Sequence, residues 1–235
     1  MNSVINIAVV GLGQVGIYLL NELNNKKKEI ELKTGKKINI VAVSAKSISK
    51  KRRFKINKKI FYKNPLEIFN KTKVDILFEA IGLSDGISKK IVETALKKKI
   101  HVVTPNKALI SKHGDYLAKL AEDNEVNLEF EASVAGGIPI LRTIKEGLAT
   151  NKISKVYGIL NGTSNYILSE MESSNDSFPN VLKKAQKLGY AEPGNPKLDL
   201  NGFDAFNKVR ILSALAFNTK ISKHKCLMEG IEKIE

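Results

Sequence analysis

Short apolar runs alternate with amphipathic stretches along the first part of the chain. The runs have the length of buried strands and lie at residues 5–10, 38–44, 74–81, 100–104 and 126–130. Apolar residues at helical spacing mark the intervening stretches 13–23, 84–98 and 107–123. This order predicts an α/β fold, a doubly wound parallel sheet with crossover helices. The lysine-rich segment 46–63 interrupts the order and is expected to be a loop with a short strand.

The order changes from Gly136 onward, which predicts a second, smaller α+β domain. We expect helices at 138–149, 163–172 and 178–188, a strand at 153–160, and a last helix that contains Asp204. The predicted domains are therefore 1–134 and 135–235. A lone strand cannot satisfy its own hydrogen-bond ladder, so the second domain predicts a partner strand from missing residues or from another molecule.

Composition narrows the functional classes. The formal net charge of +15 would suit nucleic acid, and Lys50, Lys51, Arg52 and Arg53 form the densest basic run. Lysine is common along the whole chain, however, so no specific nucleic-acid partner is expected. No run approaches the roughly 20 apolar residues of a membrane span. The N-terminus resembles no signal peptide and Cys226 stands alone, so a cytoplasmic protein without an internal disulfide is expected.

A glycine-rich turn joins the first predicted strand to the first predicted helix. It reads Gly11-Leu12-Gly13-Gln14-Val15-Gly16. The first glycine permits a tight turn, the second lets backbone approach a pyrophosphate, and the third allows close helix packing. In this context the motif predicts a Rossmann-type dinucleotide site.

The end of the second strand bears on which dinucleotide binds. An NAD-selective site usually has Asp or Glu there, but this chain reads Val43-Ser44-Ala45-Lys46. Lys46 and the basic run at 50–53 would favour a 2′-phosphate, so NADP is preferred over NAD, unless these residues form only a solvated loop. Gly82, just after the third strand, completes the expected cofactor set.

Two lysines are candidates for chemistry. Asp204 and Lys208 are four residues apart on an apolar helical pattern, and both fall on the side of Ile211. The pair is expected to point inward and to form a polar site with nearby Glu192, although such pairs also occur on surfaces. Lys107, in Thr104-Pro-Asn-Lys107, follows the fourth strand at the edge where ligands bind; alternatively it simply begins a helix.

Taken together, the motifs resemble those of the homoserine dehydrogenase family over nearly the whole chain. Besides the glycine-rich turn and Thr104-Pro-Asn-Lys107, the similarity rests on Glu131-Ala-Ser-Val-Ala-Gly-Gly-Ile-Pro139, Asn161-Gly-Thr-Ser-Asn165, Gly189-Tyr-Ala-Glu192 and Gly202-x-Asp204-x-x-x-Lys208. Nothing resembles a regulatory domain, and the C-terminal part of the family pattern is missing. The resemblance is therefore to the single-function type.

The resemblance implies NAD(P)-dependent interconversion of L-homoserine and L-aspartate 4-semialdehyde in threonine and methionine biosynthesis. Lys208 would donate and accept the proton at the reacting oxygen, with Lys107 as the second candidate. Glu192 and Asp204 would hold the substrate's amino group. The other substrate-site positions that the resemblance implies are Asn161, Gly162, Thr163 and, in place of an acidic residue that normally follows Glu192 more closely, Asp199.

The resemblance also implies a structural monovalent cation, such as Na⁺, and a homodimer. The cation positions would be Glu131, Val134, Gly136 and Ile138, mainly through backbone oxygens. From the residues alone, 136–139 is equally a turn before a helix. His101, His113 and His224 lack a shared metal-binding spacing and are expected to be structural.

Two rival functions remain open at the sequence level. One is a related semialdehyde or amino-acid dehydrogenase with the same N-terminal domain, which would need different polar residues around Glu192 to Lys208. The other is a non-catalytic dinucleotide-binding protein left after C-terminal loss, which would bind cofactor without turnover.

Overall fold

The structure is a computed structural model, and it describes residues 3–49, 56–193, 196–221 and 226–234. The chain divides into two compact units, Met1–Gly137 and Ile138–Glu235. The sequence-based boundary at 134 lies within the last residues of the first unit. The basic residues 50–53, together with Gly194, Asn195 and His224, lie outside the described residues.

The first unit is built on a parallel six-stranded sheet with the strand order β3-β2-β1-β4-β5-β6. The strands are β1 (Val4–Val10), β2 (Lys37–Ser44), β3 (Phe61–Tyr62), β4 (Ile76–Glu79), β5 (His101–Val103) and β6 (Leu128–Glu129). This order is that of a doubly wound dinucleotide-binding sheet, which confirms the predicted fold class. β3 confirms the short strand expected within 46–63.

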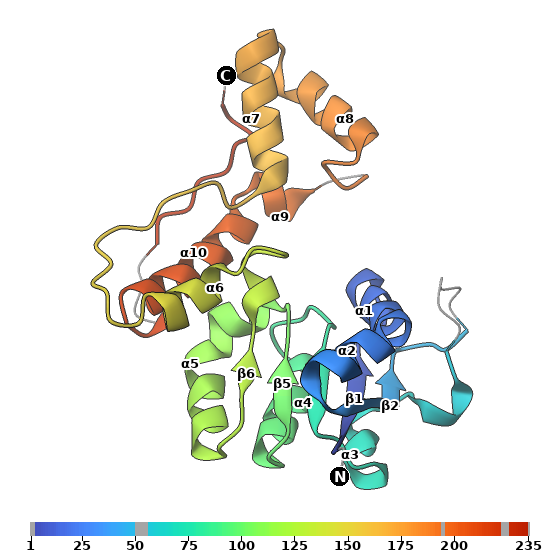
Figure 1. Cartoon of the computed structure of the whole chain (residues 1–235). Coiled ribbons are helices and arrows are strands. Elements are labelled where there is room, and N and C mark those ends of the chain that lie inside the picture. Colours follow the sequence, from blue (N-terminus) through green and yellow to red (C-terminus); the bar gives the residue numbers. More distant parts are fainter. Residues whose placement is uncertain (1–2, 50–55, 194–195, 222–225, 235) are drawn as a thin grey trace. The chain divides into compact units, whose positions relative to one another are not determined.

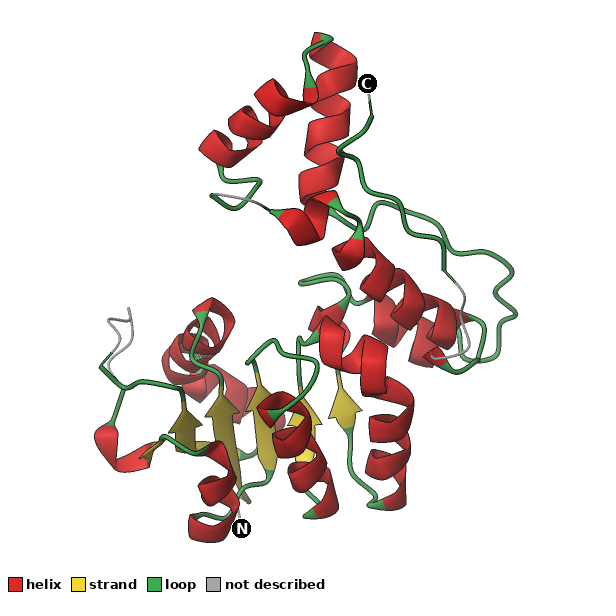
Figure 2. Ribbon diagram, turned by 180° about the vertical axis from the view of Figure 1, so that it is seen from behind, coloured by secondary structure: helices red, strands yellow, loops and turns green. Residues whose placement is uncertain are grey.

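Helices cover both faces of this sheet, as the views from opposite sides in Figures 1 and 2 show. The helices of the unit are α1 (Gln14–Asn25), α2 (Lys27–Thr34), α3 (Ile68–Lys71), α4 (Ile87–Lys97) and α5 (Lys107–Asp123). Short 3₁₀ turns occur at η1 (Lys58–Ile60), η2 (Pro65–Glu67) and η3 (Glu131–Ser133). The sequence analysis predicted α1, α4 and α5 but neither α2 nor α3.

The glycine-rich turn depends on two close backbone contacts. Gly11 has a φ of +94°, and a Cβ there would lie 2.3 Å from the carbonyl carbon of Ala80. A Cβ on Gly16 would lie 2.0 Å from the carbonyl oxygen of Gly11. Only glycine therefore lets α1 start tightly against the ends of β1 and β4.

The described residues of the second unit form helices and loops. Its helical segments are α6 (Ile140–Arg142), the π-helical turn η4 (Thr143–Gly147), α7 (Gly162–Ser174), α8 (Phe178–Leu188), α9 (Lys197–Leu200) and α10 (Phe203–Ala216). The helix expected at 138–149 is thus shorter, and α9 lies in what was expected to be a loop. A core of buried apolar residues joins α7, α8 and α9; it comprises Ile167, Val181, Ala185, Ala191 and Leu200.

The predicted strand at 153–160 is wrong. The described structure has no strand there, and the segment is an irregular loop. Its apolar side chains face outward, with Tyr157 86% and Ile159 74% exposed. A strand needs a neighbour that exchanges backbone hydrogen bonds, and no segment within the described ranges takes that place.

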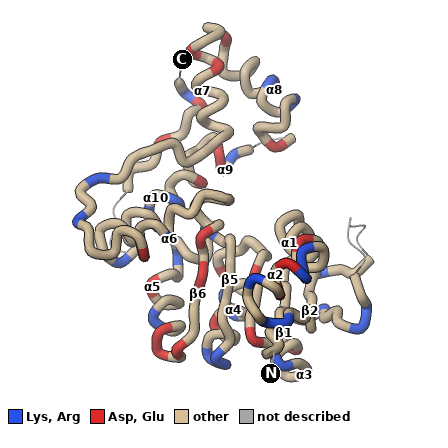
Figure 3. Tube along the Cα trace, viewed as in Figure 1, with Lys and Arg blue, Asp and Glu red and all other residues tan. Residues whose placement is uncertain are grey.

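The basic surplus is distributed over the chain, as the sequence suggested. Figure 3 shows Lys and Arg along most of the described trace, interleaved with Asp and Glu. Among the helices that the structure describes, none combines the length and apolarity that a membrane crossing requires.

Replacing Gly16 with Ala should destabilise the first unit, because the new methyl group meets the backbone of Gly11 rather than a flexible side chain. We expect Gly16→Ala to lower the free energy of unfolding by about 3 kcal/mol in urea denaturation followed by circular dichroism. Gly13→Ala is the matched control, since an added Cβ there has no atom within 4 Å. A loss below about 1 kcal/mol is expected for this control. Equal losses in the two variants would contradict the explanation.

Candidate functional site

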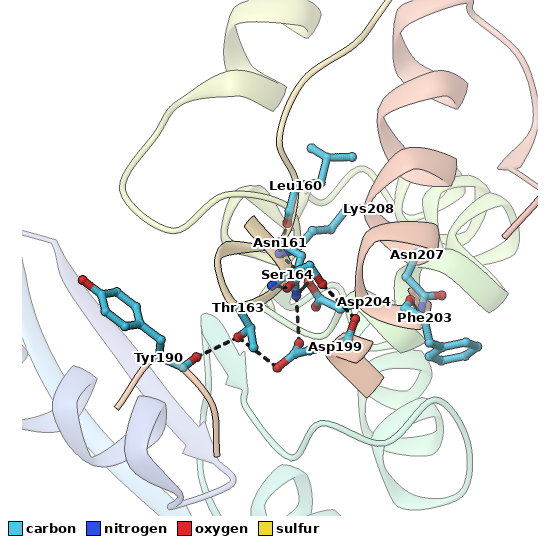
Figure 4. Close-up of polar contacts among 10 residues, drawn as sticks. All are labelled: Leu160, Asn161, Thr163, Ser164, Tyr190, Asp199, Phe203, Asp204, Asn207 and Lys208. Carbon is cyan, nitrogen blue, oxygen red and sulfur yellow. Dashed lines mark hydrogen bonds and ion pairs between the residues drawn. The ribbon is translucent and has the colours of Figure 1, made fainter. Parts of the chain in front are cut away.

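Helix α10 carries an inward ion pair. Asp204 is 7% exposed, and Ile211, two helical turns later on the same face, is fully buried. Nζ of Lys208 lies 2.8 Å from Oδ2 of Asp204. Lys208 also donates a hydrogen bond of 2.7 Å to the backbone carbonyl of Leu160. The predicted inward direction of the pair is confirmed. Figure 4 shows Lys208 reaching from α10 towards Leu160.

Asn161 joins three parts of this unit. Its Oδ1 caps α7 by accepting a bond of 2.8 Å from the backbone N–H of Ser164. Its Nδ2 donates to Oδ1 of Asp199 at 2.8 Å and to Oδ2 of Asp204 at 2.9 Å. A single side-chain amide therefore holds α9 and α10 at the N-terminus of α7, with both carboxylates drawn to one place.

Thr163 and Ser164 both bond to Asp199, the first to its carboxylate and the second to its backbone carbonyl. The Thr163 hydroxyl donates to the Tyr190 carbonyl at 2.7 Å and lies 3.2 Å from Oδ2 of Asp199. Ser164 Oγ donates to the backbone carbonyl of Asp199 at 3.1 Å. Figure 4 shows Thr163 between Tyr190 and Asp199. The loop after α8 and helix α9 are thus both tied to the first turn of α7.

The rings of Tyr166 and Tyr190 support the same connection. Their centroids are 4.4 Å apart and their planes differ by 13°, a stacked arrangement. Stacking keeps the Tyr-Ala-Glu segment beside α7 and so helps to set where the loop after α8 runs.

We call Asn161, Asp199, Asp204 and Lys208 the acid–lysine cluster. Two carboxylates and one ammonium give it a formal charge of −1, and Asp204 and Lys208 are largely shielded, with side chains 9% and 18% exposed. A partly buried negative charge attracts a cationic group of a ligand. The arrangement suits an ammonium next to a group that Lys208 could protonate or deprotonate.

The sequence and the structure differ on which acid joins this cluster. The sequence analysis gave Glu192 the main role and Asp199 a secondary one. In the structure Glu192 is exposed, and its backbone carbonyl accepts a bond of 3.3 Å from Gln186. Asp199 instead occupies the centre of the network. Gly162 begins α7 and places Asn161 and Thr163 on either side of it.

The expected dinucleotide residues gather around the carboxyl ends of the strands of the first unit. Gly13 is the N-cap of α1, Gln14 begins that helix, and Gly82 follows β4 with a φ of +89°. Leu12 is buried, Val15 is 57% exposed, and Lys46 is an exposed residue just beyond the end of β2. Lys107 begins α5, whose N-cap Asn106 accepts a bond of 3.1 Å from Leu109 N–H.

A buried carboxylate beneath this edge was not noticed in the sequence. Glu79, the last residue of β4, is fully buried and accepts a bond of 2.6 Å from the Thr104 hydroxyl. It also accepts from the backbone N–H of Ile81 at 2.9 Å. The sequence does mark this residue, because Glu79 is an acidic residue within the otherwise largely apolar run 74–81.

Three of the four expected cation positions, Glu131, Val134 and Gly136, belong to the end of the first unit, and Ile138 is the first residue of the second. Glu131 begins η3, and its carbonyl accepts bonds from the N–H groups of Val134 and Ala135. The hydroxyl of Ser133, between Glu131 and Val134, is buried without a hydrogen-bond partner in the described structure. Gly136 and Ile138 are exposed.

Histidine does not contribute a metal site in the described ranges. His101 accepts a bond from Asn127 N–H at 3.0 Å, and His113 pairs with Asp85 at 2.9 Å. No group of three or more His, Cys, Asp or Glu side chains in the described part of the chain could hold a metal ion.

Comparison with known proteins gives a consistent result. Residues 139–235 match the family described as "Homoserine dehydrogenase", and residues 11–131 match "Homoserine dehydrogenase, NAD binding domain". The homoserine dehydrogenase of Neisseria gonorrhoeae is 42% identical over 98% of this chain and 52% of its own length. That of Bacillus subtilis is 36% identical over 98% of this chain and 53% of its own length.

A solved structure shows the same fold. The crystal structure of a homoserine dehydrogenase from Thiobacillus denitrificans aligns with a TM-score of 0.90 and 37% identity, over 100% of this chain and 54% of that one. The chain therefore spans about half the length of these three relatives. On the fold, the motifs and these similarities, the chain belongs to the homoserine dehydrogenase family.

Proposed function

We propose that the protein interconverts L-homoserine and L-aspartate 4-semialdehyde with NADP as the preferred cofactor over NAD. The observation that carries this proposal is the formal charge of −1 on the acid–lysine cluster. Both substrates carry an α-ammonium and an oxygen at C4, which match the carboxylates and the lysine. A cytoplasmic location stays a prediction.

The substrate ammonium is held by carboxylates in this proposal. Asp204 and Asp199 are supported in that role by Asn161, whose Nδ2 donates to an oxygen of each, at 2.9 Å and 2.8 Å respectively. Both carboxylates therefore lie beside the same amide. Gly162 and Thr163 line the same place through the first turn of α7. Glu192 is retained as a further ligand, since its exposure leaves its side chain available to a bound substrate.

Lys208 is the proposed proton-transfer group. During reduction the Lys208 ammonium gives a proton to the carbonyl oxygen at C4, and during oxidation the neutral Lys208 amine accepts the hydroxyl proton of homoserine. Its hydrogen bond to the Leu160 carbonyl and its ion pair with Asp204 orient the amine. Lys107, at the start of α5, is the second candidate.

The dinucleotide is assigned to the glycine-rich turn of the first unit. The open surroundings of Gly13 support this assignment. A Cβ at Gly13 would meet no atom within 4 Å, so the start of α1 is open to a pyrophosphate. Lys46 is proposed to pair with the 2′-phosphate, and Gly82 to leave room beside β4. When bound, the nicotinamide supplies the hydride acceptor or donor.

A structural Na⁺ is proposed at Glu131, Val134, Gly136 and Ile138. The buried hydroxyl of Ser133 supports the assignment, since an orphaned oxygen at this place suits a cation nearby. Its role is to hold the turn, with no part in proton transfer.

A homodimer is proposed through the segment 152–160. Tyr157 and Ile159 are 86% and 74% exposed, and the segment is rich in apolar and β-branched residues without pairing to a strand in the described structure. Pairing with a second molecule would satisfy its backbone groups and cover these side chains.

Replacing Lys208 should abolish turnover. We expect Lys208→Ala to lower kcat for L-homoserine oxidation, followed as NADPH absorbance, by roughly 100- to 10,000-fold. Lys197→Ala, which removes an exposed lysine of the same unit, should leave kcat unchanged. NADPH binding by both variants should match that of the original protein. Cofactor binding without turnover in the original chain would favour the non-catalytic alternative.

Replacing Lys46 should change cofactor preference. Loss of one charged contact to a 2′-phosphate predicts that Lys46→Ala lowers kcat/KM with NADP about tenfold and leaves kcat/KM with NAD unchanged. Lys59→Ala, an exposed lysine of η1, is the matched control. If both cofactors respond equally to Lys46→Ala, the assignment of this residue is incorrect.

Adding charge to the exposed segment should separate the dimer. Ile159→Lys is expected to shift the protein from dimer to monomer in sedimentation-velocity measurements. Leu32→Lys, at an 85% exposed apolar position on α2, should leave the sedimentation coefficient unchanged. A monomeric original chain would refute dimerisation.

A further inference from the structure

We propose that Glu79 is a positioning residue for dinucleotide binding, and this inference rests on the proposed function. Its carboxylate bonds to the segments that follow β4 and β5, and the segment after β4 in turn contacts the glycine-rich turn after β1. Glu79 lies at the carboxyl end of β4, the edge of an open parallel sheet where ligands bind. It is fully buried, so it acts through the segments it holds rather than by touching the cofactor.

The first connection runs from Glu79 to the glycine-rich turn. Oε1 of Glu79 accepts a bond of 2.9 Å from Ile81 N–H, which closes a tight loop over Ala80. Ala80 N–H donates to the Val10 carbonyl at 2.7 Å, and a Cβ at Gly11 would overlap the Ala80 carbonyl group. The course of residues 80–81 therefore decides where the expected pyrophosphate turn lies.

The second connection runs from Glu79 to the segment that presents Lys107. Oε2 of Glu79 accepts a bond of 2.6 Å from Thr104 Oγ1 and lies 3.4 Å from Asn106 Nδ2. The same Asn106 amide donates to the Leu83 carbonyl at 2.8 Å, while Asn106 Oδ1 caps α5. One carboxylate thus links the loop after β4 to the first turn of α5.

The chemistry of these contacts requires a carboxylate. A carboxylate only accepts hydrogen bonds, and the Thr104 hydroxyl, the Ile81 N–H and the Asn106 amide all donate to it. A glutamine would direct its own N–H₂ group at one of these donors. Burying a charge is costly, and three donors with the N-terminus of α5 beside Asn106 offset that cost.

The test is NADPH binding followed by its fluorescence, together with steady-state kinetics. We expect Glu79→Gln to raise the NADPH Kd and the KM for NADP about tenfold while the KM for homoserine changes less than about twofold. Thr104→Val should raise the NADPH Kd in the same direction. Thr104→Ser, which keeps the hydroxyl, should restore the original Kd.

The control separates positioning from general stability. Leu117→Ala removes a buried side chain of α5 outside the network and should lower the unfolding midpoint without changing the NADPH Kd. An unchanged NADPH Kd in Glu79→Gln, or an equal rise of the Kd in Leu117→Ala, would overturn this inference and leave the proposed function standing. Failure of the original chain to bind NADPH would overturn both this inference and the proposed function. A Kd that follows the hydroxyl at position 104 supports the inference even if Glu79→Gln does not fold.

Discussion

A carboxylate removed from water must be met by hydrogen-bond donors, and this constraint organises both units. In the first unit, Glu79 gathers donors from the ends of β4 and β5. In the second, Asp204 receives the amide of Asn161 and the ammonium of Lys208. Each acid therefore fixes chain segments far apart in the sequence, and it does so with directional bonds rather than with packing alone.

The two units bring distant backbone segments together by different physical means. The first relies on the absence of side chains: Gly11 and Gly16 allow backbone to approach backbone where any Cβ would overlap. The second relies on specific side chains, since Asn161 donates both hydrogens of its amide to two different carboxylates. The family models divide the chain at nearly the same place, with the NAD-binding domain matched over residues 11–131 and the second match over residues 139–235.

The sequence predicted best what depends on local periodicity. Every strand expected in the first unit is present, and α8 has the expected limits of Phe178–Leu188. Helix α2 was missed because its lysines resembled a bias in composition, although Lys27–Glu31 and Lys33–Glu29 have the spacing of helical ion pairs. The strand at 153–160 was wrong because a run rich in β-branched and apolar residues reports a preference for extended backbone and cannot supply a hydrogen-bonded neighbour.

The site was predictable where a side chain carries the chemistry. Asp204 and Lys208 follow from spacing on one helix. The hydrogen bond from Lys208 to the Leu160 carbonyl could not be predicted from the sequence, because every residue carries the same backbone carbonyl group. That Asn161 bonds to Asp199 and not to Glu192 depends on contacts between residues far apart in the sequence, which local spacing cannot report.

The placement of Asp204 and Lys208 on successive turns of α10 has a mechanical consequence. The spacing of the two charged groups is set by the pitch of one helix, a stiff element, rather than by the path of a loop. Loops elsewhere in the unit can differ in path without changing the separation of the two Cα atoms, which one turn of helix fixes. The pairing of Asp204 and Lys208 is therefore a property of α10 itself.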